Sequence, residues 1–246
     1  MAVLVTRPSP DSDTTAAALR ARGFEVLPAP MLRFEPVPCS GLDADYGAVI
    51  LTSANALRAV EGQLGEALLK LPLFAVGETT AAAARKTGFG KVIAAESDAA
   101  GLRDLVRAGV KKRQFRKSDA LLYLAGGDLS RDLAGELAAD GLNVVTVTTY
   151  RMAALSNLPS EACDAFASNA VQAVLHYSQR SARAFLDAAR ADGVEISALA
   201  VPHCCLSANV AAILREAGAT QVLSAATPDE KALFAALERA LRSQLA

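Results

Sequence analysis

The chain has 246 residues, enough for two modest domains or one large one. Hydrophobic residues make up 52%, as in a globular protein, and a net charge of −1 excludes the strongly basic surface that bulk nucleic-acid binding needs. No apolar run approaches the ~18 residues of a membrane span. The first residues indicate a strand rather than a signal peptide, so we expect a cytoplasmic protein with neither a membrane nor a nucleic-acid partner.

The chain begins with a predicted strand–helix–strand unit. Ala2 to Thr6 is apolar enough for a buried strand, and the helix that follows ends at Gly23 in a left-handed cap. Phe24 to Leu27 is the second strand. Closely spaced prolines cannot continue a helix or a central strand, so we expect an extended linker at Pro28, Pro30, Pro36 and Pro38.

A second unit begins with Ala48 to Leu51, an apolar run typical of a buried parallel strand. Thr52, Ser53 and Asn55 follow, and each can cap a helix. The apolar spacing beyond them predicts a helix that continues to about Leu69. Such a turn is an ordinary helix cap or, at the carboxyl edge of a parallel sheet, an anion site. The turn by itself leaves both interpretations open.

A third unit begins with strand Leu73 to Val76 and the polar turn Gly77 to Thr80. A helix is expected from Ala81 to Gly88, then a strand from Lys91 to Ala94 and another helix around residue 105. The basic run Lys111 to Lys117 is predicted to be a solvated loop. The alternative is that this run forms a positively charged surface that attracts a carboxylated substrate.

The whole pattern then repeats. Val3 matches Leu121 in a second strand–helix–strand unit, which contains the turn Gly126-Gly127 and the strand Val144 to Val147. Ala48 matches Ala173, and Gly77 matches Ser207. Units of this length are too long for a solenoid. Three units used twice predict two similar parallel-sheet α/β domains, with their polar turns facing a cleft between them.

Cysteine and histidine give no sign of a metal site. Cys39, Cys163, Cys204 and Cys205 lack the spacing of zinc ligands, and we expect buried, reduced thiols. His176 and His203 are each expected to be isolated strand residues rather than ligands or bases.

Four segments in this order resemble the uroporphyrinogen-III synthase family: Val5 to Pro8, Thr52 to Asn55, Val76 to Ala81 and Thr148 to Tyr150. The resemblance covers nearly the whole chain, from Ala2 to about Leu241. No single motif is specific, and the order and spacing together carry the likeness.

The resemblance implies that the first unit leaves its own half and packs with the other. One discontinuous α/β domain would comprise residues 1–35 and 153–246, and the other residues 39–148. Residues 36–38 and 149–152 would form a two-stranded linker between them. Each domain would have a flavodoxin-like strand order. The repeat by itself leaves contiguous halves equally open.

The resemblance also implies an activity, that of a hydro-lyase in haem biosynthesis. Such enzymes cyclise hydroxymethylbilane, with loss of water and inversion of ring D, to uroporphyrinogen III. No cofactor is needed, because the pyrroles supply the electrons. Backbone N–H groups at strand-to-helix turns would bind the substrate's eight carboxylates. We expect a monomer, and a transient contact with the bilane-forming enzyme is left open.

Tyr150 matches the family's tyrosine at the end of its strand. It is expected to protonate or orient the leaving group, with packing across the linker as its alternative role. The expected substrate-binding residues lie in the turns and are Arg7, Ser53, Asn55, Gly77, Thr79, Thr80, Gly126, Gly127, Ser178 and Ser207.

The second half departs from the family pattern at Tyr177 to Ser181 and at Leu206 to Val210. Ala125 stands where relatives often carry arginine, although Arg131 is kept. These changes affect individual contacts rather than the fold. The alternative function is a non-catalytic two-domain binding or sensor protein for a tetrapyrrole or another small anion. The intact Tyr150, Thr80 and Ser53 favour the enzyme.

Overall fold

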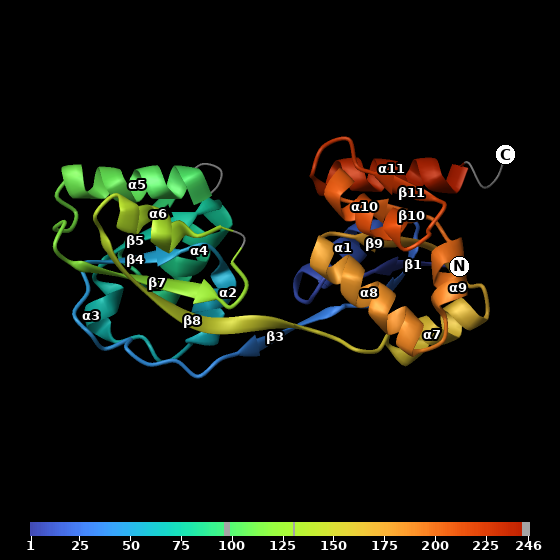
Figure 1. Ribbon diagram of the computed structural model, residues 1–246, viewed down its shortest axis with the longest axis horizontal. Helices are drawn as coiled ribbons and strands as arrows, with labels where there is room; N and C mark the ends of the chain where they lie inside the picture. The colour runs from blue at the N-terminus through green and yellow to red at the C-terminus, as the bar shows by residue number, and fades with distance from the viewer. Residues whose placement is uncertain (96–98, 130, 243–246) are drawn as a thin grey trace. The chain divides into compact units, whose positions relative to one another are not determined.

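The computed structural model describes residues 1–95, 99–129 and 131–242. The chain divides into two compact units, each an α/β assembly of a sheet and its helices (Figure 1). Unit 1 comprises Met1–Arg33 and Ala153–Ala246, and unit 2 comprises Phe34–Met152. Residues 243–246, the end of the first predicted domain, lie outside the described residues. The predicted α/β class is confirmed.

Unit 1 contains a parallel sheet with the strand order β11–β10–β9–β1–β2. Its strands are β1 (Ala2–Val5), β2 (Glu25–Pro28), β9 (Val171–His176), β10 (His203–Cys205) and β11 (Val222–Ser224). Its helices are α1 (Asp11–Arg20), α7 (Ser160–Ala167), α8 (Gln179–Ala191), α9 (Glu195–Ala200), α10 (Ala208–Glu216) and α11 (Glu230–Arg242). The helices α7 and α9 were not predicted.

Unit 2 contains a sheet with the strand order β3–β8–β7–β4–β5–β6. Its strands are β3 (Leu32–Pro36), β4 (Ala48–Leu51), β5 (Pro72–Val76), β6 (Lys91–Ala95), β7 (Ala120–Gly126) and β8 (Asn143–Ala154). Its helices are α2 (Ala54–Ala59), α3 (Glu66–Leu69), α4 (Gly77–Thr87), α5 (Ala99–Lys111) and α6 (Leu133–Ala139). From β8 to β6, neighbouring strands are parallel.

The predicted repeat appears as matching strand orders. The strands β1, β2, β9, β10 and β11 of unit 1 correspond in the repeat to β7, β8, β4, β5 and β6 of unit 2. Both sets have the same spatial order, with the second strand outside the first and the remaining three on the other side. This is the 2-1-3-4-5 order of doubly wound flavodoxin-like sheets. In each sheet, therefore, the first unit of one half pairs with the last two units of the other half.

The core of unit 2 follows from the alternation of side chains along β4. Val49 and Leu51 pack with α2 and α4, whereas Ala48 and Ile50 pack on the other face with α5 and α6. All four are fully buried, as expected for a parallel strand covered on both faces. Burial of each large aliphatic side chain contributes about 1.5–3 kcal/mol, so both helical layers stabilise the sheet.

Two predicted helix boundaries are wrong. The helix after Ser53 ends at Ala59 rather than near Leu69, because Gly62 adopts a left-handed φ of 75° and a separate helix, α3, follows. Helix α4 begins at Gly77 rather than Ala81. Residues 149–152, predicted as part of a two-stranded linker, belong to β8, and β3 lies beside β8 at the sheet edge, where proline is tolerated.

Candidate functional site

The turns that follow β4, β5 and β7 lie at one edge of the unit 2 sheet, because these strands are parallel. Gly126, the last residue of β7, is paired with Tyr150 of the parallel strand β8. This edge therefore collects the residues predicted for unit 2: Ser53, Asn55, Gly77, Thr79, Thr80, Gly126, Gly127 and Tyr150.

Ser53 caps helix α2. Its Oγ accepts a hydrogen bond of 3.2 Å from the backbone N–H of Asn55, and its extended backbone is typical of a cap. This is the ordinary structural role of such a turn. Asn55 is half-buried in the first turn of the helix.

Gly77 opens helix α4 with a φ of 68°, in the left-handed region that side-chain-bearing residues rarely adopt. The two threonines that follow face different surroundings, since Thr79 is exposed and Thr80 is buried. Only Thr79 therefore offers its side chain directly to solvent.

The ring of Tyr150 lies against the backbone of Gly126. A Cβ atom at Gly126 would come within 2.8 Å of Tyr150 Cζ and 2.9 Å of its hydroxyl oxygen. The N–H of Gly127 donates to the carbonyl oxygen of Tyr150 at 2.8 Å. The buried Thr149 hydroxyl donates to the carbonyl oxygen of Ala125 at 3.2 Å. These contacts hold the tyrosine over the end of β7.

A second tyrosine lies close to the first and was not predicted as part of the site. Tyr123, buried in β7, shares a hydrogen bond of 3.0 Å with Thr52 Oγ1. Burial raises the pKa of Tyr123, the hydrogen bond with Thr52 lowers it in part, and the nearby Tyr150 raises it further. The sequence places Tyr123 within an apolar strand, where its hydroxyl gives no separate signal.

An aromatic and cationic stack continues from Tyr150. Phe34 of β3 stacks on Tyr150, with ring centroids 5.5 Å apart and planes inclined by 28°. The guanidinium carbon of Arg58 lies 4.3 Å from the Phe34 centroid. Phe34 and Arg58 were not predicted for the site, since neither belongs to a turn motif.

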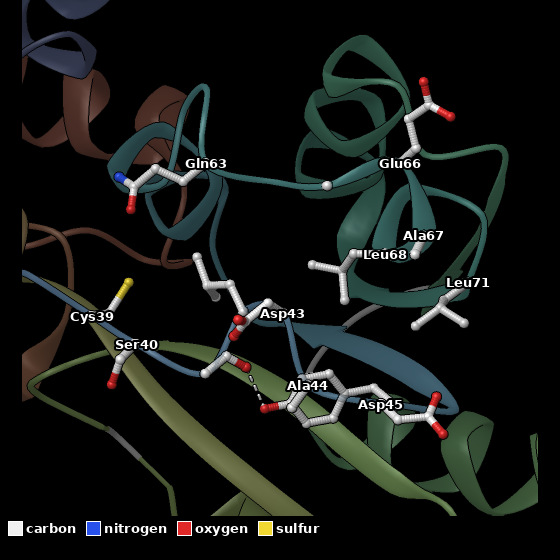
Figure 2. Close-up of a pocket in the computed structure, with 14 residues that line it drawn as sticks. Cys39, Ser40, Asp43, Ala44, Asp45, Gln63, Glu66, Ala67, Leu68 and Leu71 are labelled. Carbon is white, nitrogen blue, oxygen red and sulfur yellow. Dashed lines mark hydrogen bonds between the residues drawn. The ribbon is translucent and has the colours of Figure 1, made fainter.

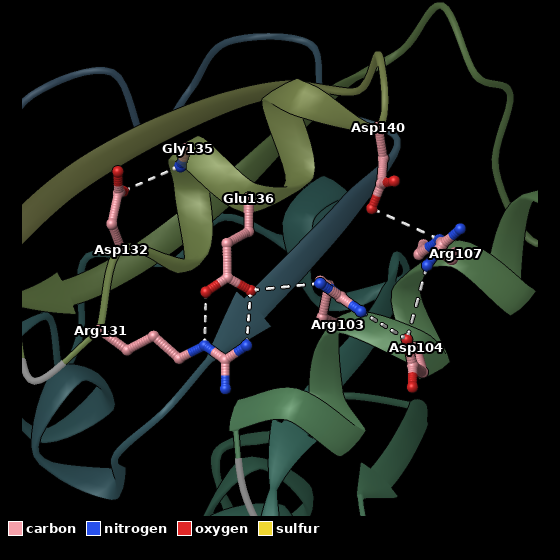
Figure 3. Close-up of polar contacts among 8 residues, drawn as sticks. All are labelled: Arg103, Asp104, Arg107, Arg131, Asp132, Gly135, Glu136 and Asp140. Carbon is pink, nitrogen blue, oxygen red and sulfur yellow. Dashed lines mark hydrogen bonds and ion pairs between the residues drawn. The ribbon is translucent and has the colours of Figure 1, made fainter.

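A network of ion pairs fixes the segment after β7 (Figure 3). Arg131 Nε and Nη2 donate to the two carboxylate oxygens of Glu136 at 2.5 and 2.8 Å. The pKa of Glu136 is lowered, mainly because its carboxylate accepts these hydrogen bonds from Arg131. Arg103 of α5 lies 3.6 Å from the same carboxylate, and Arg107 lies 3.4 Å from Asp140. The network thus joins α6 to α5.

Arg7, predicted to bind substrate, lies after β1 in unit 1 and is already paired with carboxylates. Its Nη2 donates to Asp11 at 2.8 Å, and its Nη1 lies 3.5 Å from Oε1 of Glu230. Glu230 Oε1 also accepts from Thr15 at 2.5 Å and from Tyr177 at 3.0 Å. Arg7 can therefore bind a further carboxylate only by exchange or by sharing its donors.

Tyr177 supports this cluster in a way that the sequence did not indicate. The Arg7 guanidinium carbon lies 4.7 Å from the centroid of its ring. The pKa of the Tyr177 hydroxyl is raised, mainly because the group is buried. The hydroxyl therefore keeps its proton and donates a hydrogen bond to Glu230.

Ser178 and Ser207 are helix caps. Ser178 Oγ accepts from the N–H of Ser181 at 3.1 Å at the start of α8, and Ser207 Oγ accepts from the N–H of Val210 at 3.4 Å at the start of α10. Both follow parallel strands, so they lie at the same edge of the unit 1 sheet as Arg7.

The expectation that His176 and His203 are isolated is wrong. Adjacent strands bring His176 Nε2 to 3.0 Å from His203 Nδ1, and both rings are fully buried. His203 Nε2 lies 3.0 Å from the carbonyl oxygen of Ala198 and must donate to it, so His203 Nδ1 accepts from His176. The remaining nitrogen, His176 Nδ1, has no partner among the described residues.

The expectation for the cysteines is partly confirmed. All four are free thiols, and Cys204 and Cys205 are buried, whereas Cys39 and Cys163 are only half-buried. Burial raises the pKa of Cys204 and of Cys205 to about 12. In the part of the chain that the structure describes, no three His, Cys, Asp or Glu side chains gather as a metal site would require.

A pocket of about 590 Å³ lies at the opposite edge of the unit 2 sheet, where β4 and β5 begin (Figure 2). Residues 39–46 and helix α3 line it, and the Tyr46 hydroxyl donates to the carbonyl oxygen of Gly41 at 2.6 Å. No residue predicted for the site lines this pocket, so it is separate from the candidate site.

Comparisons with known proteins bear on the whole chain. Residues 13–235 match the family model described as uroporphyrinogen-III synthase HemD. A comparison with curated protein sequences gave no significant match. Within the described residues, no helix is both long and apolar enough to cross a membrane.

Two solved structures resemble the chain over nearly its full length. The uroporphyrinogen-III synthetase from Helicobacter pylori is 17% identical, with a TM-score of 0.63, and the alignment covers 100% of this chain and 99% of that one. A mutant uroporphyrinogen III synthase from Thermus thermophilus is 17% identical, with a TM-score of 0.55, and the coverage is 99% and 100%. At this identity the likeness establishes the fold.

Proposed function

Because this chain belongs to the uroporphyrinogen-III synthase family, we propose that it cyclises hydroxymethylbilane to uroporphyrinogen III. The observation that carries the proposal is the family match over residues 13–235, which extends through both units. Nothing in the described residues favours the non-catalytic binding or sensor alternative.

The proposed reaction conserves atoms without an added reactant. The hydroxyl of the bilane leaves as water after protonation, and the electrons of its pyrrole form an azafulvene. The far ring attacks through its substituted carbon to give a spiro intermediate. This intermediate fragments and recloses, which inverts ring D, and a proton lost from the ring restores the pyrrole. The pyrroles supply the electrons, so we propose that no metal or organic cofactor takes part.

We assign the role of acid to Tyr150. Its hydroxyl lies at the end of β7, above a glycine whose missing side chain leaves room for it. From this position it would protonate or orient the leaving hydroxyl, a step for which a positioned acid contributes about 10²–10⁴-fold in general. Stacking on Phe34 restricts the Tyr150 ring before the substrate binds. The ring therefore loses less conformational entropy when the transition state forms.

The substrate's carboxylates would bind to donors at the two carboxyl edges. We propose that the binding residues are Arg7, Ser53, Asn55, Gly77, Thr79, Thr80, Gly126, Gly127, Ser178 and Ser207. Backbone N–H groups at these turns make charge-assisted bonds without a large net charge, which suits a chain whose net charge is −1. A floppy chain of four rings must be held in the spiro geometry, so positioning is the main task of the protein. We further propose that the enzyme acts as a cytoplasmic monomer.

A coupled assay tests the proposal. Hydroxymethylbilane is generated in situ with and without the protein, and the oxidised porphyrin isomers are separated. Without a catalyst the bilane closes to the type I isomer, so a shift to type III is the expected result. If a folded protein gives only type I, the enzyme proposal fails and the binding alternative replaces it.

A further inference from the structure

Arg58 contacts the aromatic ring that stacks on the proposed acid, and it belongs to none of the predicted motifs. It occupies the last turn of α2, and its guanidinium stacks on Phe34, which in turn stacks on Tyr150. The three side chains form one continuous stack, from a cation at the surface to the hydroxyl-bearing ring. A group bound at Arg58 is therefore held close to Tyr150.

The Arg58 side chain is exposed, and no carboxylate of the described residues pairs with it. Two arginines elsewhere in unit 2, Arg131 and Arg151, differ in this respect. Arg131 binds Glu136 at 2.5 Å, and Arg151 binds Glu35 at 2.8 Å. A compensated guanidinium must give up or share a partner to bind a new carboxylate. Arg58 can bind one without that loss.

The stacking also prepares Arg58 for a planar anion. A guanidinium that lies over an aromatic face keeps its N–H donors around its rim, where they remain free for two parallel hydrogen bonds to a carboxylate. The aromatic contact restricts the long side chain before binding, so less rotamer entropy is lost when the anion arrives.

We propose that Arg58 binds a carboxylate of the tetrapyrrole and so places one ring beside Tyr150. The proposal rests on the proposed function and adds a substrate-binding residue to it. The charge, exposure and lack of a carboxylate partner at Arg58 support the ligand class, and the stack through Phe34 supports its position.

The first experiment compares steady-state constants of Arg58→Gln, Arg58→Lys and the wild type in the coupled assay. For Arg58→Gln, we expect KM to rise about tenfold with kcat nearly unchanged, as the loss of one charge-assisted hydrogen bond to an exposed group predicts. Arg58→Lys keeps the charge but not the bidentate geometry, so its KM should lie between the two, about threefold above wild type.

Arg113→Gln is the matched control. Arg113 is also exposed and has no carboxylate partner among the described residues, but it lies in the loop between α5 and β7, at the opposite edge of the sheet. We expect its KM to stay within twofold of wild type. An equal rise of KM in Arg113→Gln would overturn the proposal in favour of a general electrostatic attraction by the basic run. A KM of Arg58→Gln within twofold of wild type would overturn it as well.

A binding measurement separates this proposal from the proposed function. Uroporphyrin III, an unreactive octacarboxylate, is titrated by fluorescence into wild type, Arg58→Gln and Arg113→Gln. If wild type forms no type III product but binds uroporphyrin, and Arg58→Gln alone weakens binding about tenfold, the carboxylate site stands and only turnover is excluded. If wild type does not bind uroporphyrin, or all three proteins bind it equally, the proposal fails.

Discussion

The backbone of Gly126 lies against the ring of Tyr150, so that a Cβ atom at Gly126 would come within 2.8 Å of Tyr150 Cζ. Strand pairing causes this approach, because Gly126 and Tyr150 are partners in the register of β7 and β8. A glycine is thus needed at position 126 because the Tyr150 side chain of the neighbouring strand occupies the space of a Cβ atom, and not because of the turn that follows β7.

Gly126→Ala should displace the Tyr150 ring. Since the added methyl group meets an aromatic ring next to the backbone, we expect a destabilisation of about 1–3 kcal/mol. The rate of type III formation should fall at least tenfold, because a small misplacement of a catalytic group is costly. Thermal unfolding and the coupled assay measure the two effects.

Gly90→Ala is the control for this substitution. It adds the same methyl group in the same unit, where no atom lies within 4 Å of the new Cβ. We expect nearly wild-type stability and activity. Equal losses in both variants would show that the Gly126 effect does not arise from Tyr150.

Tyr150→Phe separates proton transfer from packing. Phenylalanine keeps the stack on Phe34 but removes the hydroxyl, so stability should change by less than about 1 kcal/mol. If Tyr150 is the acid, kcat should fall about 10²-fold with little change in KM. A variant with wild-type kcat would leave Tyr150 only its packing role against Phe34 and Gly126.

The buried His176–His203 pair should make stability dependent on pH. Burial lowers the pKa of His203 to about 4 and that of His176 well below its usual range, so the native state resists protonation. The unfolded chain binds protons near pH 6.5, and stability is therefore complete above that pH and declines as the pH falls toward 4. His203 alone should account for about 2 kcal/mol between pH 7.5 and pH 5.

Denaturant unfolding at pH 7.5, 6.5, 5.5 and 5.0 measures this dependence. The chain contains no other histidine, so the double variant His176→Leu/His203→Leu should lose most of the decline between pH 6.5 and 5.5. An equal decline in the double variant would assign the effect to carboxylates instead.

Glu230→Gln tests whether Arg7 binds substrate. Glutamine still accepts hydrogen bonds from Tyr177 and Thr15 but removes a negative charge beside Arg7. If Arg7 binds a substrate carboxylate by sharing its donors, KM should fall two- to threefold, as expected for a modest electrostatic effect of about 0.5 kcal/mol. An unchanged or higher KM at wild-type stability would instead indicate that Arg7 serves the structure of unit 1.

Local sequence patterns predicted several elements well. The strand Ala48–Leu51 has the predicted bounds, since an apolar run followed at once by capping residues can form little else in a parallel sheet. The predictions of Ser53, Ser178 and Ser207 as residues of strand-to-helix turns depend on similarly local signals. Boundaries failed where glycine allowed two outcomes, as at Gly62 and Gly77.

The contacts that matter most for the candidate site are between residues far apart in the chain. Phe34 meets Tyr150, Thr52 meets Tyr123, and His176 meets His203 only because neighbouring strands bring them together. None of these residues carries a local signal of its partner. For this reason the local pattern predicts isolated histidines and gives no sign that Arg58 contacts Phe34.

The sequence by itself determined the α/β class, the internal repeat and the family. The periodicity of the apolar residues, the turn residues and the order of the motifs are all local features of the sequence. Only the tertiary structure decided that β1 pairs with β9 and β7 with β4, since the repeat is equally compatible with contiguous halves. It likewise decided which side chains face each other at the sheet edges. Strand pairing and side-chain contact are non-local interactions, and their energies depend on register and burial that no local pattern specifies.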